Sequence, residues 1–253
     1  MTTGAMEQLP LRVHLRDTAR FASFVVGANR EAEHELADPT GPRVVWLWGR
    51  PGSGKTHLLQ AACAAAGERG DAAAYFELAS APSSAVLEGC ETLHVVCLDG
   101  LELVAPDAGW NAAMFRLYTL LQESGGRLVV ASAAPPASLA FTLPDLRSRL
   151  LAASVHQLVE LDEAGLCEAL RLRAAARGLE LSEEAALYLV HRLPRDTHSL
   201  FDVLDRLDDA SLAAQRRLTI PFLREQLERV FSVECLAVSR KQLHRTPRQS
   251  HSH

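Results

Sequence analysis

Residues 49–56 read Gly-Arg-Pro-Gly-Ser-Gly-Lys-Thr, which are the residue types and spacing of a phosphate-binding loop. The glycines let consecutive backbone N–H groups turn toward an anion, and the dipole of a following helix adds positive potential at the same place. Lys55 would reach the β- and γ-phosphates of a nucleotide, and the Thr56 hydroxyl would ligate Mg²⁺. The predicted nucleotide site therefore comprises Gly49, Arg50, Pro51, Gly52, Ser53, Gly54, Lys55 and Thr56.

Strands and helices alternate around and after this loop. An apolar run at 44–48 has strand character and residues 57–66 have helix character, which is the setting that the loop requires. Further elements follow in the same order: strands at 71–78 and 93–98, a helix at 110–123 and a strand at 128–131. This alternation predicts an α/β domain, in which helices cover both faces of a mostly parallel sheet.

A second region begins near residue 162, where the strand patterns stop. Four helical patterns follow, at 164–177, 183–193, 197–214 and 221–227. The last residues are rich in Ser, Gln and His, a composition typical of solvated chain. We therefore expect four segments: a flexible arm (1–20), a nucleotide-binding α/β domain (21–161), a smaller all-helical domain (162–229) and a disordered tail (230–253).

Asp99 is the expected partner of Thr56 at a Mg²⁺ ion. It ends an apolar strand about forty-five positions after the loop, where a parallel sheet brings a carboxylate beside the loop. A turn aspartate without a ligand is the alternative. Many ATPases place a second carboxylate directly after this one to orient the attacking water, but here that residue is Gly100, and Glu102 is expected to fall short. Hydrolysis by the chain alone should be slow, because positioning and charge stabilisation supply most of the catalysis.

Two arginines, Arg147 and Arg149, stand two residues apart near the end of the α/β domain. One of them is a candidate arginine finger, a side chain that stabilises the charge developing on a transferred phosphoryl group. Solvated arginines on a helix face are the alternative. Residue spacing alone favours neither interpretation.

Charge and composition exclude several classes of partner. The 26 basic and 31 acidic residues give a net charge of −5, and residues 230–253 carry four basic residues and one acid, which leaves about −8 for residues 1–229. An acidic body argues against binding to nucleic acid through phosphate contacts. No apolar run approaches the roughly 18 residues of a membrane span. The five cysteines form no C-x-x-C pair, which is typical of a cytoplasmic protein with reduced thiols.

Several segments together resemble the AAA+ ATPases of the bacterial DnaA initiator class. The similar segments are 21–29, the loop and its helix at 48–59, the strand end at 97–99 and the arginine pair at 147–149. The resemblance covers roughly residues 20–228. Segments at 131–136, 143–146 and 213–222 are most similar to regulatory members of the class, which inactivate DnaA.

This resemblance implies an AAA+ P-loop domain followed by a helical lid domain, with ADP or ATP and Mg²⁺ as cofactors. Beyond the loop, it implies nucleotide contacts from Val26, Gly27 and Asn29, and from His198 in the lid. Ala133 stands where the class has a polar or acidic sensor, and His198 where the lid has an arginine. Both departures remove contacts with a γ-phosphate, so the bound nucleotide would be ADP in a structural role.

A peptide near the N-terminus, Gln-Leu-Pro-Leu, is similar to the Gln-Leu-x-Leu peptide by which replication proteins dock on the DNA sliding clamp. Gln8 would contact a polar rim, and Leu9 and Leu11 would enter an apolar groove. Arg12 stands where many such peptides carry an apolar residue. Only 24 residues follow Arg229, fewer than the DNA-binding domain of DnaA requires, so contact with DNA is expected only through the clamp.

The resemblance implies a negative regulator of replication initiation. Gathered by the DNA polymerase III sliding clamp (its β subunit) on DNA, the chain would insert Arg149 toward the γ-phosphate of DnaA-bound ATP and promote its hydrolysis. Its own ATPase activity would be weak or absent. The alternatives are a self-sufficient AAA+ ATPase, such as a helicase loader or a DnaA-like replication factor, and a P-loop scaffold without nucleotide. The expected partners are DnaA and the clamp, and a homo-oligomer is compatible with the class.

Overall fold

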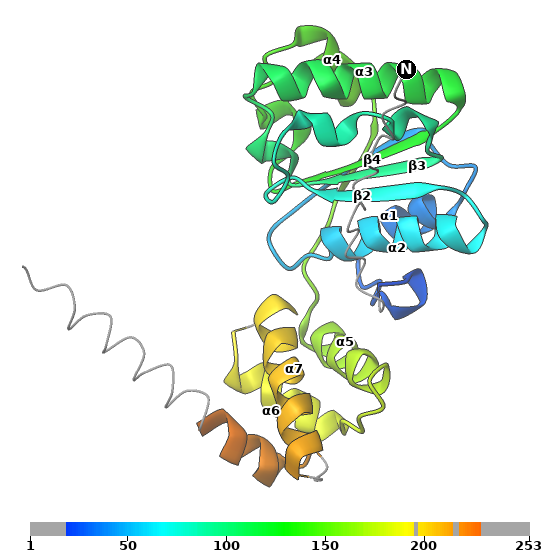
Figure 1. The fold of residues 1–253 in the computed structure, drawn as a ribbon. Helices are drawn as coiled ribbons and strands as arrows, with labels where there is room; N and C mark the ends of the chain where they lie inside the picture. Colours follow the sequence, from blue (N-terminus) through cyan, green and yellow to red (C-terminus); the bar gives the residue numbers. More distant parts are fainter. Residues whose placement is uncertain (1–18, 195–196, 215–217, 229–253) are drawn as a thin grey trace, which may run out of the picture. The chain divides into compact units, whose positions relative to one another are not determined.

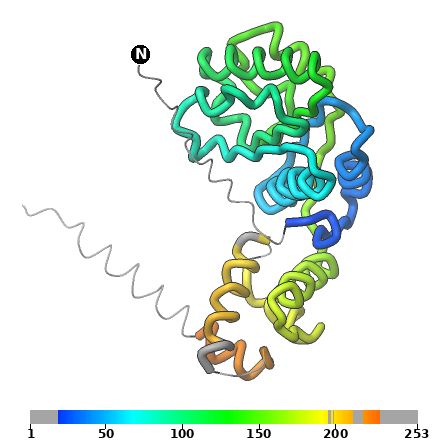
Figure 2. The backbone as a smooth tube through the Cα atoms, turned by 45° about the vertical axis from the view of Figure 1, so that its right-hand side comes forward, coloured from blue at the N-terminus to red at the C-terminus, as the bar shows by residue number. Residues whose placement is uncertain are grey.

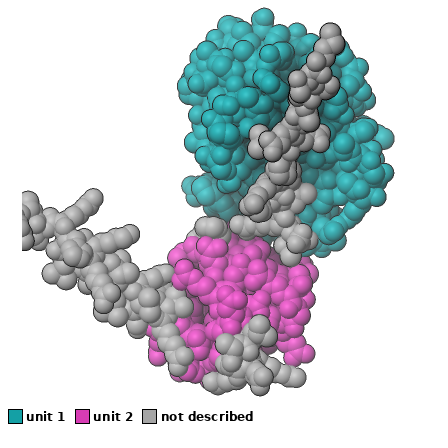
Figure 3. All heavy atoms as spheres, in the orientation of Figure 1, with its two compact units in different colours: residues 1–165 teal, residues 166–253 magenta. Residues whose placement is uncertain are grey.

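The computed structural model describes residues 19–194, 197–214 and 218–228. The chain divides into two compact units, residues 1–165 and residues 166–253 (Figure 3). This division falls within a helix, a few residues beyond the domain boundary predicted at 161/162. Each unit has its own buried side chains, so each is described by itself.

The first unit is built on a five-stranded, fully parallel sheet with the strand order β2-β3-β4-β1-β5 (Figure 1). Its strands are β1 (Val44–Trp48), β2 (Ala73–Glu77), β3 (Val95–Asp99), β4 (Arg127–Ser132) and β5 (Ser154–Gln157). The central strands are buried on both faces, which accounts for their continuous apolar runs. The predicted α/β fold with a parallel sheet is confirmed.

Helices cover both faces of this sheet (Figure 1). One face is covered by α1 (Arg30–Ala37) and α2 (Lys55–Glu68), and the other by α3 (Ala108–Ser124) and α4 (Pro144–Leu151). Five short 3-10 turns complete the unit: η1 (Phe21–Ser23), η2 (Ser84–Leu87), η3 (Cys90–Thr92), η4 (Leu101–Leu103) and η5 (Pro136–Ser138). The backbone runs from β1 through a short loop directly into α2, as the tube in Figure 2 shows.

The interior of the sheet satisfies its own polar groups. Trp46 is fully buried, and its indole Nε1–H donates to Ser132 Oγ on the neighbouring strand at 2.8 Å. Arg127 is also buried, and its guanidinium donates to four backbone carbonyls at the end of α1 and the loop that follows. Paired polar groups of this kind avoid the free-energy penalty of burial without a hydrogen bond.

Strand β5 is the one strand that the sequence patterns did not predict. It pairs with β1 at the edge of the sheet, and its four residues, Ser-Val-His-Gln, contain a single large apolar side chain. Its side chains alternate between half-buried and exposed, so the strand lacks the apolar run of a central strand. Its formation depends on pairing with β1, which is a tertiary contact.

The second unit is entirely helical in its described part. Its helices are α5 (Glu163–Ala175), α6 (Glu183–Arg192), α7 (Thr197–Ala214) and a final helix over residues 220–228. Apolar side chains from all four helices are buried, among them Leu170, Leu189, Leu204 and Phe222. Arg173 on α5 pairs with Asp205 on α7 at 2.9 Å, which ties two of the helices together. No helix in the described ranges is long and apolar enough to cross a membrane.

Candidate nucleotide site and arginine helix

The loop between β1 and α2 has a backbone that only glycine accommodates at two places. Gly49 lies so close to the chain that a Cβ atom there would stand 2.5 Å from the carbonyl oxygen of Leu158. Gly54 has φ +96°, and a Cβ atom there would stand 2.7 Å from Cε2 of Phe24. Other residues would therefore distort the loop. The loop leads directly into the N-terminus of α2, where the helix dipole favours an anion.

Lys55, the first residue of α2, curls back over this loop. Its Nζ donates to the carbonyl oxygens of Gly49 at 2.7 Å and Arg50 at 2.8 Å. Burial lowers the pKa of Lys55, and the nearby carboxylates of Asp99 and Glu102 partly oppose that shift. The ammonium group is therefore held, half-buried, at the mouth of the loop, where an anionic ligand could interact with it.

Asp99 and Thr56 meet at the carboxyl end of the sheet. The Thr56 hydroxyl donates to Asp99 Oδ2 at 2.6 Å, although the two residues are 43 positions apart in the sequence. Tyr75 on β2 donates to the same oxygen at 3.0 Å. Burial raises the pKa of Asp99, while the two hydrogen bonds act in the opposite direction. Tyr75 was not predicted, because its apolar surroundings in the sequence mark it only as a strand residue.

The residues at this point fit a magnesium ion of the kind that nucleotides carry. A hydroxyl and a carboxylate are hard oxygen ligands, and Mg²⁺ at such sites is completed by phosphate oxygens and water. The described residues contain no group of three or more His, Cys, Asp or Glu side chains able to hold a metal by themselves. Thr56 and Asp99 therefore form half of a site that a nucleotide would complete.

Ser53 gives a second sign that the loop is shaped for a ligand. Its side chain is 95% buried, with a relative exposure of 5%. Within the described part of the chain, its Oγ has no hydrogen-bond partner. A buried hydroxyl without a partner is unfavourable, and a phosphate oxygen bound in the loop would satisfy it.

Glu102 lies closer to the site than the sequence suggested. Gly100 adopts φ +86°, and the chain then turns through η4, so Glu102 returns toward the sheet. Its Oε2 accepts a hydrogen bond from the backbone N–H of Ala133 at 3.1 Å. Ala133 directly follows β4, at the position where a sensor side chain was expected. The sequence showed only how far Glu102 stands from Asp99 along the chain, and not that the chain turns back toward the sheet.

The three predicted nucleotide contacts ahead of α1 differ in their burial and in their partners. Asn29 is buried, and both polar atoms of its amide bind the backbone of Val159, at 2.9 Å and 2.8 Å. Gly27 is exposed and packs near Leu161, while Val26 is half-buried. Asn29 thus holds the stretch that leads toward α5. Nucleotide contacts from Val26, Gly27 and Asn29 stay predictions.

Arg149 lies on α4, on the face of the sheet opposite α2. Its side chain is exposed, and its guanidinium stacks on two rings of α3, 4.7 Å from the centre of Phe115 and 5.3 Å from that of Tyr118. No carboxylate in the described ranges forms an ion pair with it. Arg147 is also exposed but has no such aromatic support. The two rings were not predicted, because only the packing of α3 on α4 brings them to Arg149.

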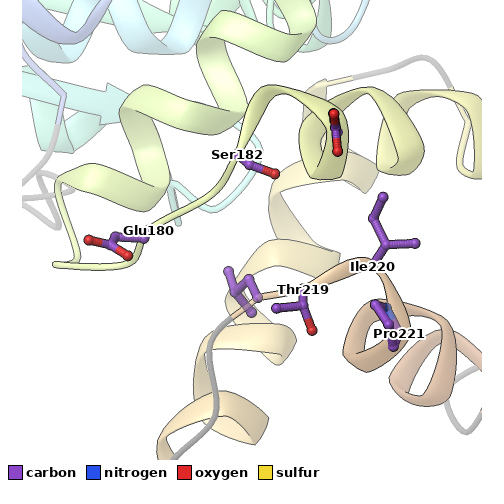
Figure 4. Close-up of a pocket in the computed structure, with 7 residues that line it drawn as sticks. Glu180, Ser182, Thr219, Ile220 and Pro221 are labelled. Atoms are coloured by element: carbon purple, nitrogen blue, oxygen red, sulfur yellow. The ribbon is translucent and has the colours of Figure 1, made fainter.

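A cavity of about 390 Å³ lies in the helical unit, away from the loop residues in sequence (Figure 4). Its lining residues are Glu180, Ser182, Glu184, Leu218, Thr219, Ile220 and Pro221. The lining contains two carboxylates and no lysine or arginine. It is therefore unsuited to a nucleotide phosphate.

Solved structures share the fold of the chain. Domain III of the Thermotoga maritima replication initiation protein DnaA is 20% identical, with a TM-score of 0.70 over 84% of this chain and 96% of that one. A DNA replication initiation factor is 20% identical, with a TM-score of 0.65 over 75% of this chain and 64% of that one. AMPPCP-bound DnaA from Aquifex aeolicus is 23% identical, with a TM-score of 0.58 over 70% and 61% of the two chains. This chain thus spans less than two thirds of the length of the last two, and the likeness establishes an AAA+ fold.

The helical unit matches a known family of domains. A family model described as Hda, lid domain, matches residues 162–227, which contain α5, α6, α7 and most of the final helix. This part of the chain is therefore similar to the lid domain of Hda. The lid-domain match agrees with the DnaA-like fold of the first unit, and the resemblance to DnaA-related AAA+ proteins is confirmed.

Two sets of predicted site residues are not described by the structure. Gln8, Leu9 and Leu11 lie outside the described ranges, as do residues 230–253. His198 lies in α7, but its side chain is outside the described part of the chain. The clamp peptide and the lid contact therefore stay predictions.

Proposed function

We propose that this chain is a negative regulator of replication initiation that stimulates hydrolysis of DnaA-bound ATP together with the DNA-loaded sliding clamp. The chain supplies Arg149 in trans, and its own nucleotide is structural. The match of residues 162–227 to the Hda lid domain and the DnaA-like fold support a role in replication and an interaction with DnaA.

The observation that carries this proposal is the state of Arg149. An exposed guanidinium without a carboxylate partner in the described residues retains its full charge for an outside ligand. Stacking on Phe115 and Tyr118 limits the freedom of the side chain without neutralising it. A pre-oriented arginine loses less entropy when it reaches a phosphate, and it stabilises the charge that develops during phosphoryl transfer.

The chain's own nucleotide site has the features of a site that binds a nucleotide and hydrolyses it weakly. Lys55 and the loop backbone would bind the phosphates of ADP or ATP, and Ser53 would gain the partner that it lacks. Thr56 and Asp99 would hold Mg²⁺, which neutralises phosphate charge. Gly100 stands where many ATPases have a second carboxylate, which supports weak hydrolysis by the chain itself.

The sliding clamp would bring this chain close to DnaA on DNA. Gln8, Leu9 and Leu11 would dock in a groove of the clamp, and the clamp on DNA would bring the regulator to DnaA. Tethering raises the effective concentration of a weakly interacting pair, so the clamp is expected to be required for full stimulation. This places the chain at replicating DNA in the bacterial cytoplasm without direct DNA contact.

The test is hydrolysis of DnaA-bound ATP with clamp-loaded DNA, comparing the parent chain with Arg149→Ala and Arg147→Ala. Both substitutions remove one exposed arginine from the same helix, so their effects on net charge are matched. Arg149→Ala should lower the stimulated rate on the order of 10³-fold, and Arg147→Ala should lower it little. Full stimulation by Arg149→Ala would refute the assignment of the finger.

A self-sufficient AAA+ ATPase is the second candidate, favoured by the return of Glu102 toward the site. The two functions differ in turnover by the isolated protein. Steady hydrolysis above about 0.1 s⁻¹, a low rate for an enzyme, would favour the ATPase. A scaffold without nucleotide would release neither ADP nor ATP when the purified protein is denatured.

A further inference from the structure

Glu102 occupies the place of the missing sensor side chain at the edge of the sheet. Strand β4 lies between β1 and β3, with Trp48 paired to Ser132 and Asp99 paired to Ala131. Ala133, which directly follows β4, therefore lies between the start of the phosphate loop and Asp99. Glu102 binds its N–H at 3.1 Å, so a carboxylate stands where the strand ends converge.

The charges around this point are unbalanced. Lys55 is the cation of the loop, and its interacting carboxylates are those of Asp99, Glu102 and Glu160. Glu160 has a cation of its own, Arg50, at 3.9 Å. Among the described residues, Glu102 forms no ion pair, and its hydrogen bond is with the neutral N–H group of Ala133. Its negative charge is thus balanced only in part, by Lys55, which also interacts with Asp99 and Glu160.

We propose that Glu102 sets the nucleotide preference of this site, favouring a diphosphate over a triphosphate by placing its carboxylate where the γ-phosphate would come. The inference rests on the proposed function, in which the chain holds ADP, and it names the residue responsible. An ADP molecule ends at the β-phosphate, within reach of Lys55, and leaves the carboxylate solvated. A γ-phosphate would extend toward Glu102 and lose free energy through repulsion between like charges.

The hydrogen bond between Glu102 and the backbone of Ala133 fixes the position of the repelling carboxylate. The hydrogen bond with Ala133 holds one carboxylate oxygen at the sheet, so the side chain cannot simply turn away into water without losing that bond. Ala133 itself has no polar group that could bind a γ-phosphate. The site therefore lacks an attractive contact at this point and has a repulsive one instead.

The experiment compares Glu102→Gln with the parent in the full chain, by titration with ADP and with AMPPCP at one Mg²⁺ concentration. Glutamine keeps an oxygen that can accept from the Ala133 N–H, so the substitution removes charge with little effect on the turn. Glu123→Gln is the matched control, since Glu123 is an exposed glutamate on α3 that loses the same charge. AMPPCP is used because it measures triphosphate binding without hydrolysis.

The parent should bind ADP more tightly than AMPPCP, and Glu102→Gln should raise the AMPPCP affinity about tenfold with much less effect on ADP. Glu123→Gln should leave the ratio of the two affinities unchanged. An unchanged ratio in Glu102→Gln, or a parent that prefers AMPPCP, would overturn the inference. If Glu102 instead activates water, the substitution would abolish ATP hydrolysis with an unchanged binding ratio, which also overturns it.

Failure of this inference is distinguishable from failure of the proposed function. Stimulation of DnaA-ATP hydrolysis is measured in a separate assay, and a chain that stimulates but shows an unchanged binding ratio contradicts only the role of Glu102. A chain that binds neither ADP nor AMPPCP contradicts both the role of Glu102 and the structural nucleotide.

Discussion

The phosphate loop and the α4 surface are opposite in how they use their charged groups. At the loop, two groups turn inward: Lys55 binds two carbonyls of its own loop, and Thr56 binds Asp99. On α4, Arg149 is exposed and rests only on aromatic rings. The residues best suited to hold a ligand lie beside α2, and the residue best suited to act on another molecule lies on α4. These two helices cover opposite faces of the sheet.

The two regions also differ in local charge. The edge of the sheet at the loop gathers Asp99 and Glu102 around Lys55, whereas the α4 surface presents Arg147 and Arg149. A holder of ADP tolerates nearby carboxylates, because its ligand carries less charge than ATP. A finger needs a free positive charge, because it stabilises a transferring phosphoryl group. Substitutions that affect one region and leave the other unchanged can test this separation.

The largest expected effect on nucleotide binding is its loss in Lys55→Ala. Removal of a charge-assisted contact to phosphate should weaken ADP binding roughly 100-fold, as measured by titration calorimetry. Arg149→Ala should bind ADP like the parent, because α4 lies on the other face of the sheet. An ADP affinity that falls equally in both variants would contradict the separation of the two regions.

Gly54→Ala should destabilise the loop region itself. The new side chain meets φ +96° and the ring of Phe24, and we expect a loss of about 3 kcal/mol in the free energy of unfolding by urea. Gly70→Ala is the control, because Gly70 has φ +83° but open space around it, and it should lose only about 1 kcal/mol. Equal losses would show that backbone strain acts alone and that Phe24 does not press on the loop.

The smallest expected effect comes from substituting the aromatic rings that support Arg149. Phe115→Leu keeps an apolar side chain but removes the nearer ring under Arg149, and it should lower DnaA stimulation about fivefold, since such contacts contribute about 1 kcal/mol. Tyr118→Phe keeps its ring and should stimulate like the parent. ADP affinity should stay unchanged in both variants. A fall in ADP affinity would mean that the α3 surface also supports the loop.

Much of the fold could be predicted because its signals are local. The glycines, Lys55 and Thr56 lie within eight consecutive residues, and the central strands are apolar runs that any parallel sheet needs. The helical second unit was recognisable from its periodic apolar positions. Strand β5 gave no such signal, because an edge strand needs few apolar residues and takes its structure from β1.

The sequence by itself determined which chemical groups this protein has: a phosphate loop, a carboxylate at the end of a strand and a pair of arginines. Only the tertiary structure decided their surroundings. It brought Tyr75 to Asp99, turned Glu102 back to Ala133 and placed Arg149 on two rings of α3. The physical reason is that these contacts join residues on different strands and helices. Their distances are set by sheet register and helix packing, which spacing along the chain does not specify.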